Sequence, residues 1–137
     1  MTPIDDLTAF IHNAMPLCAT LGITAHSLTA ERVELSLEWS ETLCTGNHIL
    51  HGGTVMALAD SAGGAAAFLN LPDDATGTST IESKTNLLGT VKNGIIVATA
   101  VPLHLGTTTM VIETEIRQAA RLVAKTTQTQ TVLRPPA

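Results

Sequence analysis

The sequence predicts an α+β fold in which a curved antiparallel β-sheet wraps around one long central helix. Two observations support this fold class. The one long helical candidate, residues 52–69, is rich in Ala and Gly, so a sheet can pack closely around it. Most of the chain after it has strand-like patterns, and short turns join these strands, which favours an antiparallel arrangement.

The first elements along the chain are a short helix and a pair of strands. Residues 3–14 are predicted to form an amphipathic helix, because their apolar side chains recur at helical spacing. These side chains are Ile4, Leu7, Phe10 and Ile11. Residues 33–39 alternate apolar and polar side chains, which indicates a strand with one buried face. Residues 23–28 are expected to pair with it across a turn near residues 29–32.

The second half of the chain is predicted to be β-structure. Four strands are expected after the central helix, at residues 79–88, 95–103, 107–117 and 122–133. The segment Lys92-Asn93-Gly94 is a turn. Pro102 is expected at a bulge or at an unpaired edge position, because it lacks an N–H group. Residues 134–137 form a tail, and the length of 137 residues fits a single domain over residues 1–137.

Composition and charge exclude several classes of protein. Hydrophobic residues make up 45% of the chain and charged residues 14%, which is a globular composition. Seven basic and twelve acidic residues give a net charge of −5, so a general nucleic-acid partner is not expected. Asp5 and Asp6 stand where a signal peptide would be basic, and no apolar run reaches the roughly 18 residues that span a bilayer. With two cysteines in no metal-binding spacing, we expect a cytoplasmic protein.

The segment His51-Gly52-Gly53 and the carboxylate Asp60 are the strongest chemical signal. The glycines begin the predicted central helix, where backbone N–H groups have no helical partner and the helix dipole is positive. Such groups stabilise a developing oxyanion, and the missing side chains let a carbonyl approach. Asp60 is the only ionised residue between His51 and Asp73. It is suited to act as a general base or as a carboxylate nucleophile.

Three patches of sequence resemble the hotdog-fold acyl-CoA thioesterases of the PaaI type. They are residues 46–60, which contain His51-Gly52-Gly53 and Asp60; residues 80–88 together with 91–94; and His104-Leu105-Gly106. The resemblance covers roughly residues 15 to 133. It implies the hotdog fold and hydrolysis of an acyl-CoA thioester to a free acid and coenzyme A. No metal and no redox cofactor are then expected, with coenzyme A present as part of the substrate. The chain departs from the family pattern at Thr45, Thr90 and Thr107.

The resemblance also implies roles for individual residues. The Gly53 N–H is the expected oxyanion donor, Asp60 the base or nucleophile, and His51 an orienting or binding group. Thr80 falls where the family often has Ser or Thr, and it is expected to position water or to bond to Asp60. Glu82, two residues further on, is expected on the same strand face as Thr80. The predicted substrate-binding residues are Gly52, Asn47, Glu82, Asn86 and Lys84.

Helix geometry predicts that the active site is shared between two subunits. Asp60 lies seven residues beyond Gly53, so the two are roughly 10 Å apart along one helix. A single carbonyl would have to lie within about 3 Å of both groups. Two antiparallel helices across a two-fold axis meet this condition, with Asp60 of one subunit facing Gly53 of the other. We therefore expect an obligate homodimer, and the resemblance further implies a homotetramer built as a dimer of dimers.

Other interpretations of the sequence remain open at this stage. The same fold would serve a non-catalytic module that binds acyl-CoA or an acyl carrier. It would also serve a hotdog dehydratase acting on hydroxyacyl thioesters, although the spacing from His51 to Asp60 fits that branch poorly. A nucleophilic Cys44 is disfavoured because no arranged base accompanies it. Lys84, Lys92 and Arg121 are solvated charges or contacts for coenzyme A phosphates. The acyl group is not specified by the sequence.

Overall fold

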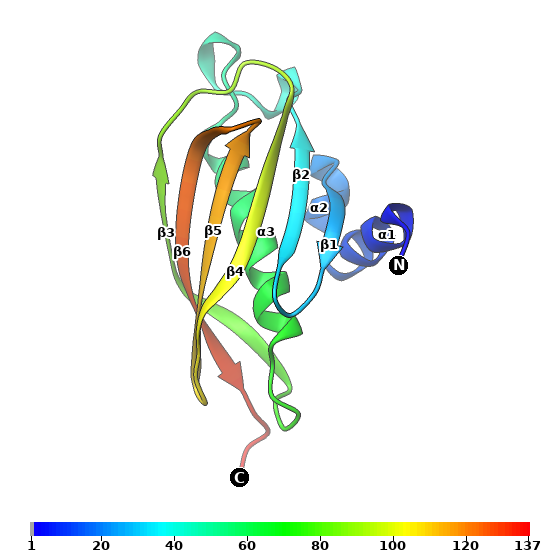
Figure 1. Cartoon of the computed structure of the whole chain (residues 1–137), viewed down its shortest axis with the longest axis vertical. Coiled ribbons are helices and arrows are strands. Elements are labelled where there is room, and N and C mark those ends of the chain that lie inside the picture. The colour runs from blue at the N-terminus through cyan, green and yellow to red at the C-terminus, as the bar shows by residue number, and fades with distance from the viewer. Residues whose placement is uncertain (1) are drawn as a thin grey trace.

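The computed structural model describes residues 2–137. Its main elements are a six-stranded antiparallel sheet in the order β1-β2-β4-β5-β6-β3 and one long helix (Figure 1). The helices are α1 (Ile4–Ala14), α2 (Pro16–Leu21) and α3 (Gly52–Leu69), with short 3₁₀ turns at Glu41–Leu43 and Gly46–His48. The strands are β1 (Thr24–Leu28), β2 (Val33–Glu38), β3 (Gly77–Leu87), β4 (Ile95–Leu105), β5 (Thr109–Gln118) and β6 (Arg121–Leu133).

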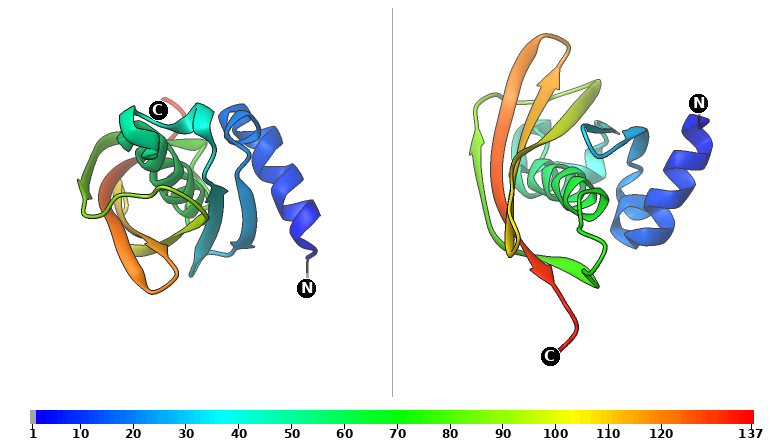
Figure 2. Two further views of the ribbon diagram at one scale, coloured as in Figure 1. Left: turned by 90° about the horizontal axis from the view of Figure 1, so that it is seen from above. Right: turned by 60° about the horizontal axis from the view of Figure 1, so that its bottom comes forward.

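The sheet curls around α3, as Figure 2 shows from two directions. Leu58, Ala59, Ala62 and Ala66 of α3 are completely buried against the inner face of the sheet. Short alanine side chains allow the strands to approach the helix axis closely. Opposite them, β4 and β5 bury larger residues such as Ile96 and Ile112. The predicted arrangement of a curved antiparallel sheet around a long central helix, the hotdog fold, is therefore confirmed.

The order of strands in the sheet differs from their order in the chain. The β4–β5 and β5–β6 connections join neighbouring strands, as expected. Residues 88–94, however, connect β3 at one edge to β4 in the interior of the sheet (Figure 1). This connection is anchored at its start and in its middle, because Leu88 N–H donates to Val123 O at 2.8 Å and Leu50 N–H donates to Val91 O at 2.9 Å. Within residues 2–137, β3 pairs only with β6.

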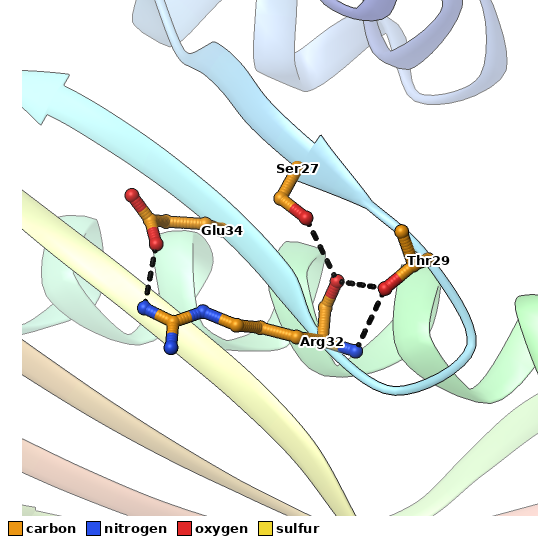
Figure 3. A network of polar contacts seen from close by, with 4 residues as sticks. All are labelled: Ser27, Thr29, Arg32 and Glu34. Carbon is orange, nitrogen blue, oxygen red and sulfur yellow. Dashed lines mark hydrogen bonds and ion pairs between the residues drawn. The ribbon is translucent and has the colours of Figure 1, made fainter. Parts of the chain in front are cut away.

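The β1–β2 pair is a hairpin closed by residues 29–32, as predicted (Figure 3). Thr29 and Arg32 exchange backbone hydrogen bonds of 3.1 and 3.3 Å. The Ser27 and Thr29 hydroxyls also donate to the Arg32 carbonyl. The Arg32 guanidinium pairs with Glu34 at 2.7 Å. Local side-chain contacts therefore fix this end of the sheet.

Helix α1 packs against the β1 strand rather than against α3. Ala25 N–H donates to Thr8 Oγ1 at 3.0 Å, and the His12 ring lies 2.7 Å from Ile23 O. Ile11 is buried, but Ile4 and Phe10 are each about half exposed (47% and 53%). The predicted apolar face of this helix is therefore only partly covered, because polar contacts as well as Ile11 attach it to the edge strand.

Pro102 lies at a bulge, and the prediction for this residue is confirmed. The β4–β5 register shifts between Pro102 and His104. On the other side of β4, pairing with β2 ends at Ala100, opposite Val33. The missing N–H of Pro102 therefore interrupts no ladder bond with β2. Among the described residues, 2–137, no helix is both long and apolar enough to cross a membrane.

Candidate active site

His51 caps the N-terminus of α3. Its backbone is extended, with φ −61° and ψ 136°, and its Nδ1 accepts a hydrogen bond from the Gly53 N–H at 2.8 Å. The His51 carbonyl accepts from Thr54 N–H at 2.9 Å and from Val55 N–H at 3.2 Å. An accepting Nδ1 requires that the ring hydrogen be on Nε2 in the neutral imidazole. The Gly53 N–H, the predicted oxyanion donor, thus already has an acceptor in the single chain.

Gly52 and the residues around it border a hollow of about 350 Å³ at the start of α3. A Cβ atom at Gly52 would lie 2.8 Å from Leu87 Cδ1, so the β3 strand approaches the helix here. Within residues 2–137, no hydrogen bond reaches the Gly52 N–H. This end of α3 therefore offers a donor and an apolar hollow, but Asp60 does not line that hollow.

Asp60 and Thr80 instead line a second pocket of about 440 Å³ between α1, α3 and β3. Both side chains are exposed in the single chain. The polar residues of this lining are Asp60, Thr78, Ser79, Thr80 and Gln130, and the larger apolar ones are Phe10, Ile11, Met15, Leu28, Phe68 and Leu69. The carboxylate therefore stands at the polar side of an otherwise apolar pocket.

Two buried glutamines of β6, Gln128 and Gln130, connect Asp60 to Thr80. Gln128 is 0% exposed and Gln130 2%. Gln128 Nε2 donates to Asp60 Oδ1 at 3.4 Å and to Gln130 Oε1 at 3.3 Å. The Thr80 hydroxyl donates to Gln130 Oε1, and Gln130 Nε2 donates to Thr78 Oγ1 at 3.2 Å. The structure thus brings Asp60 and Thr80 into one network, although no direct hydrogen bond joins them among the described residues.

The two glutamines were not predicted from the sequence. They are two residues apart, so they project from the same face of β6, between the buried Thr126 and Val132. That face packs against α3 at Gly63, where a Cβ atom would overlap the Gln128 amide. Two amides on the inner face of a strand, opposite a glycine of the central helix, are the signal that would have identified them.

A bulge in β3 separates Thr80 from the other predicted residues of its strand. Thr80 pairs with Gln130 and Glu82 pairs with Thr129, so Ile81 is an extra residue in the ladder. The prediction that Glu82 shares the face of Thr80 is wrong, because this bulge shifts the alternation by one residue. Glu82, Lys84 and Asn86 all lie on the outward face and are exposed. Their predicted contacts with substrate stay a prediction.

Asn47 lies on the exposed loop that leads to His51. Its backbone is left-handed, with φ 61° and ψ 29°, a conformation that Asn tolerates better than most residues. Next to it, the His48 ring lies 2.9 Å from the Glu41 carboxylate, and the Trp39 indole N–H donates to His48 O. The loop is therefore held by its neighbours, with Asn47 on its surface.

Cys44 is held as a structural thiol. Its Sγ donates to Ser40 O at 3.3 Å. Burial first, and then the Glu41 carboxylate, raise the pKa of the Cys44 thiol, which disfavours the thiolate that a nucleophile needs. Within residues 2–137, no cluster of three His, Cys, Asp or Glu side chains is arranged to hold a metal ion.

Comparison with known proteins agrees with this fold. The family model of the thioesterase superfamily matches residues 47–125, more than half of the chain. The matched segment includes His51, Gly53, Asp60 and Thr80. The chain therefore belongs to the thioesterase superfamily.

Individual relatives support the same assignment. A Bacillus subtilis protein named "Putative esterase ComA2" is 37% identical over 101 residues, which cover 73% of this chain and 79% of that protein. A Vibrio cholerae protein, also named "Putative esterase", is 33% identical over 98 residues, covering 68% of this chain but only 65% of that protein. A solved structure of a thioesterase family protein from Silicibacter pomeroyi superposes with a TM-score of 0.84 at 27% identity, covering 97% of this chain and all of that one.

Proposed function

We propose that this protein hydrolyses acyl-CoA thioesters to a free acid and coenzyme A. The observation that carries this proposal is the joint placement of Asp60 and Thr80 at the polar side of an apolar pocket. The apolar lining suits an acyl group, and the carboxylate stands where a thioester carbonyl would enter. Membership of the thioesterase superfamily supports the same class of reaction.

The hydrogen-bond directions suggest how water is activated. Thr80 donates its hydroxyl hydrogen to Gln130, so its remaining lone pairs are available to the pocket. Asp60 and Thr80 can therefore accept the two hydrogens of one water, leaving a lone pair on the water oxygen for attack. As the oxygen bonds to the carbonyl carbon, Asp60 takes the proton. Collapse of the oxyanion then breaks the C–S bond, and the same proton passes to the departing thiolate.

Direct attack by the Asp60 carboxylate is the second route to the same products. It would form an acyl-enzyme anhydride with loss of the thiolate, and water would then hydrolyse the anhydride. A single turnover with excess enzyme in ¹⁸O-water separates the two routes. The anhydride route delivers an aspartate oxygen to the product when water attacks the aspartyl carbon, and it leaves ¹⁸O on Asp60. Direct attack by water places all the label in the acid.

We propose that the active site is completed in a homodimer. Gly53, Met56 and Asp60 form an exposed stripe on α3 at spacings of three and four residues. Beside the stripe, β3 is an edge strand with an exposed Ile81 (61%). Two copies related by a two-fold axis would place Asp60 of one against Gly53 of the other. Pairing of such dimers gives the expected tetramer.

The Gly53 N–H would serve as oxyanion donor after a change of partner. In the single chain it donates to His51 Nδ1. His51 is exposed, so its ring can turn away when a thioester oxygen approaches. A negatively charged oxyanion is a stronger acceptor than a neutral imidazole, and so the exchange favours the transition state over the ground state. His51 then acts as the group that holds the donor in place before substrate binds.

The test is release of free thiol from a panel of aromatic and aliphatic acyl-CoAs by the wild-type protein and by Asp60→Asn and Asp60→Ala. Loss of about a hundredfold or more in turnover by both variants, with the oligomer intact, supports the proposal. Binding of acyl-CoAs without thiol release by the wild type would instead indicate a binding module. Loss of water from a 3-hydroxyacyl-CoA would indicate a dehydratase.

The outward lysine of β3 offers a test for the coenzyme A part of the substrate. Lys84 is exposed on β3, and we propose that it contacts the phosphates of coenzyme A. Lys84→Ala should raise KM for an acyl-CoA, with little effect on the matching N-acetylcysteamine thioester, which lacks phosphates. Equal effects on both substrates would show that Lys84 does not contact the phosphates of coenzyme A.

A further inference from the structure

We propose that Gln128 and Gln130 are positioning residues that orient both Asp60 and Thr80 for thioester hydrolysis. This inference rests on the function proposed above and adds two residues to its site. Both glutamines lie on β6. Gln130 lines the pocket, whereas Gln128 does not line it and connects to it through Asp60. Neither has an acidic or basic character of its own, so any role must act through their hydrogen bonds.

The burial of the two amides is the first argument. Gln128 and Gln130 are 0% and 2% exposed, and glutamine is rarely found so fully buried. Two apolar side chains of the same volume would pack on this face without the free-energy cost of removing polar groups from water. Moreover, Gln128 Oε1 has no hydrogen-bond partner among residues 2–137. A buried acceptor without a partner destabilises the fold, so a role outside stability best explains why the amide is there.

The orientation of the two amides is the second argument. Gln128 Nε2 has two hydrogens, and its two acceptors are Asp60 Oδ1 and Gln130 Oε1. Turning the Gln128 amide over would place its oxygen against these two oxygens. The Gln130 amide is fixed likewise, because its oxygen accepts from both Gln128 and Thr80 while its nitrogen donates to Thr78. The arrangement therefore has only one consistent set of donors and acceptors.

This fixed direction has consequences at the pocket. One oxygen of Asp60 is held by Gln128, which leaves the other free to face the pocket. The hydroxyl hydrogen of Thr80 is held by Gln130, which makes Thr80 an acceptor toward the pocket rather than a donor. The 3.4 Å contact between Gln128 and Asp60 is long for a hydrogen bond. Such contacts commonly shorten when substrate closes the site.

The test compares Gln128→Met, Gln130→Met and Gln128→Glu with a control, Thr126→Val. Methionine keeps the length of glutamine and removes its donors and acceptors. Thr126 is buried on the same face of β6, but it bonds to Thr85 rather than to the Asp60 network. For each variant, the measurements are the urea unfolding midpoint, kcat and KM for the best acyl-CoA, and binding of a non-hydrolysable thioether analogue.

If the glutamines position Asp60 and Thr80, Gln128→Met should unfold at the same or a higher urea concentration than the wild type. Its kcat should nevertheless fall about tenfold to a hundredfold, with little change in analogue binding. Gln130→Met should lower kcat to a similar degree. Gln128→Glu should lower it further, because a second carboxylate would face Asp60. Thr126→Val should keep kcat.

A merely structural role predicts a different pattern. In that case kcat would follow stability, and Gln128→Met would retain the wild-type kcat. That outcome would overturn the inference while leaving the proposed function intact, since Asp60→Asn tests the latter separately. If the wild type releases no thiol from any acyl-CoA, the proposed function itself fails, whatever the stability of the glutamine variants.

Discussion

Gly63 of α3 leaves the space that the buried amide of Gln128 fills, and a methyl group at Gly63 would overlap Gln128 Oε1. The central helix and β6 therefore meet at a glycine because a glutamine stands opposite. The neighbouring Gly64 has no such restriction, since a Cβ atom there would meet no heavy atom within 4 Å. The two glycines look alike in sequence but differ in what surrounds them.

Gly63→Ala should therefore destabilise the fold by about 1–3 kcal/mol, as expected for overpacking of a rigid core. It should also lower kcat, because Gln128 must move away from Asp60. Gly64→Ala is the matched control. Alanine lowers the conformational entropy of the unfolded chain, so the stability of this variant should be unchanged or higher by up to about 1 kcal/mol. Urea unfolding checks both values. Equal stability of the two variants would contradict the packing described for Gly63.

His51 should contribute to stability as the cap of α3. Because its Nδ1 accepts from the Gly53 N–H, His51→Ala should destabilise the protein by about 1 kcal/mol. His51→Asn should recover most of this loss, since Asn is a good N-cap residue. The measurement is thermal or urea unfolding of the three proteins. If the alanine variant is as stable as the wild type, His51 has no capping role.

Cys44 should be dispensable for the reaction. The pKa of its thiol is raised by burial and by Glu41, so the thiolate is scarce near neutral pH. Cys44→Ser should keep kcat within about twofold, and iodoacetamide should alkylate Cys44 more slowly than free cysteine at the same pH. Inactivation by the serine substitution would restore the cysteine nucleophile as a candidate.

The C-terminal segment should give the fold an acid-sensitive contact. Arg134 bonds to Asp74 at 2.7 Å and to Thr107 O at 2.6 Å. Its hydrogen bond holds the pKa of Asp74 below the ordinary value of 3.8 in the folded state. The unfolded chain therefore binds the proton more readily than the folded protein. The contribution of the Arg134–Asp74 contact to folding stability is thus present above about pH 4 and is lost as the pH falls through the pKa of Asp74 in the folded state.

Asp74→Asn tests this contact. The variant should be slightly less stable than the wild type at pH 7, and the difference should shrink as the pH falls below 3.8, the ordinary value for an aspartate. The effect is small because both side chains are partly solvated. Urea unfolding at several pH values gives the comparison. A difference that stays constant with pH would show that the contribution is not electrostatic.

Most of the fold could be predicted from the sequence, because its elements are marked by local patterns. The alternation in residues 33–39 and the small residues of 52–69 each specify an element without help from the rest of the chain. The placement of β3 at the sheet edge could not be predicted, because a short connection to β4 normally joins neighbours. Long-range hydrogen bonds, such as Leu88 N–H to Val123 O, determine it.

The candidate site could be predicted only in part. Asp60 and the His51-Gly52-Gly53 segment carry recognisable chemistry, and their helical spacing gives their separation. The residues of β3 and β6 around Asp60 could not be assigned from the sequence, for two physical reasons. A bulge at Ile81 changes which residues of β3 share a face, and no residue type in this segment predicts that bulge. Gln128 and Gln130 read as ordinary polar residues until the strand is known to face the central helix.

The shared active site is the central claim, and mixed dimers test it most directly. Asp60→Asn removes the base, and Gly53→Pro removes the proposed oxyanion donor. Gly53 is the second residue of α3, and proline is tolerated in a first helical turn. Gly53→Ala keeps the N–H and controls for the added side chain, whose Cβ atom would lie 2.9 Å from His51 Nδ1. Each of the two inactive variants alone should release thiol at a small fraction of the wild-type rate.

The decisive measurement is the thiol-release rate after the Asp60→Asn and Gly53→Pro chains are co-refolded in equal amounts, with mixed dimers verified by native mass spectrometry. Each mixed dimer would hold one intact site, made of Asp60 from one chain and Gly53 from the other. Random pairing predicts recovery of about a quarter of the wild-type rate. A mixture with verified mixed dimers but no activity above that of its two parents would contradict the shared site.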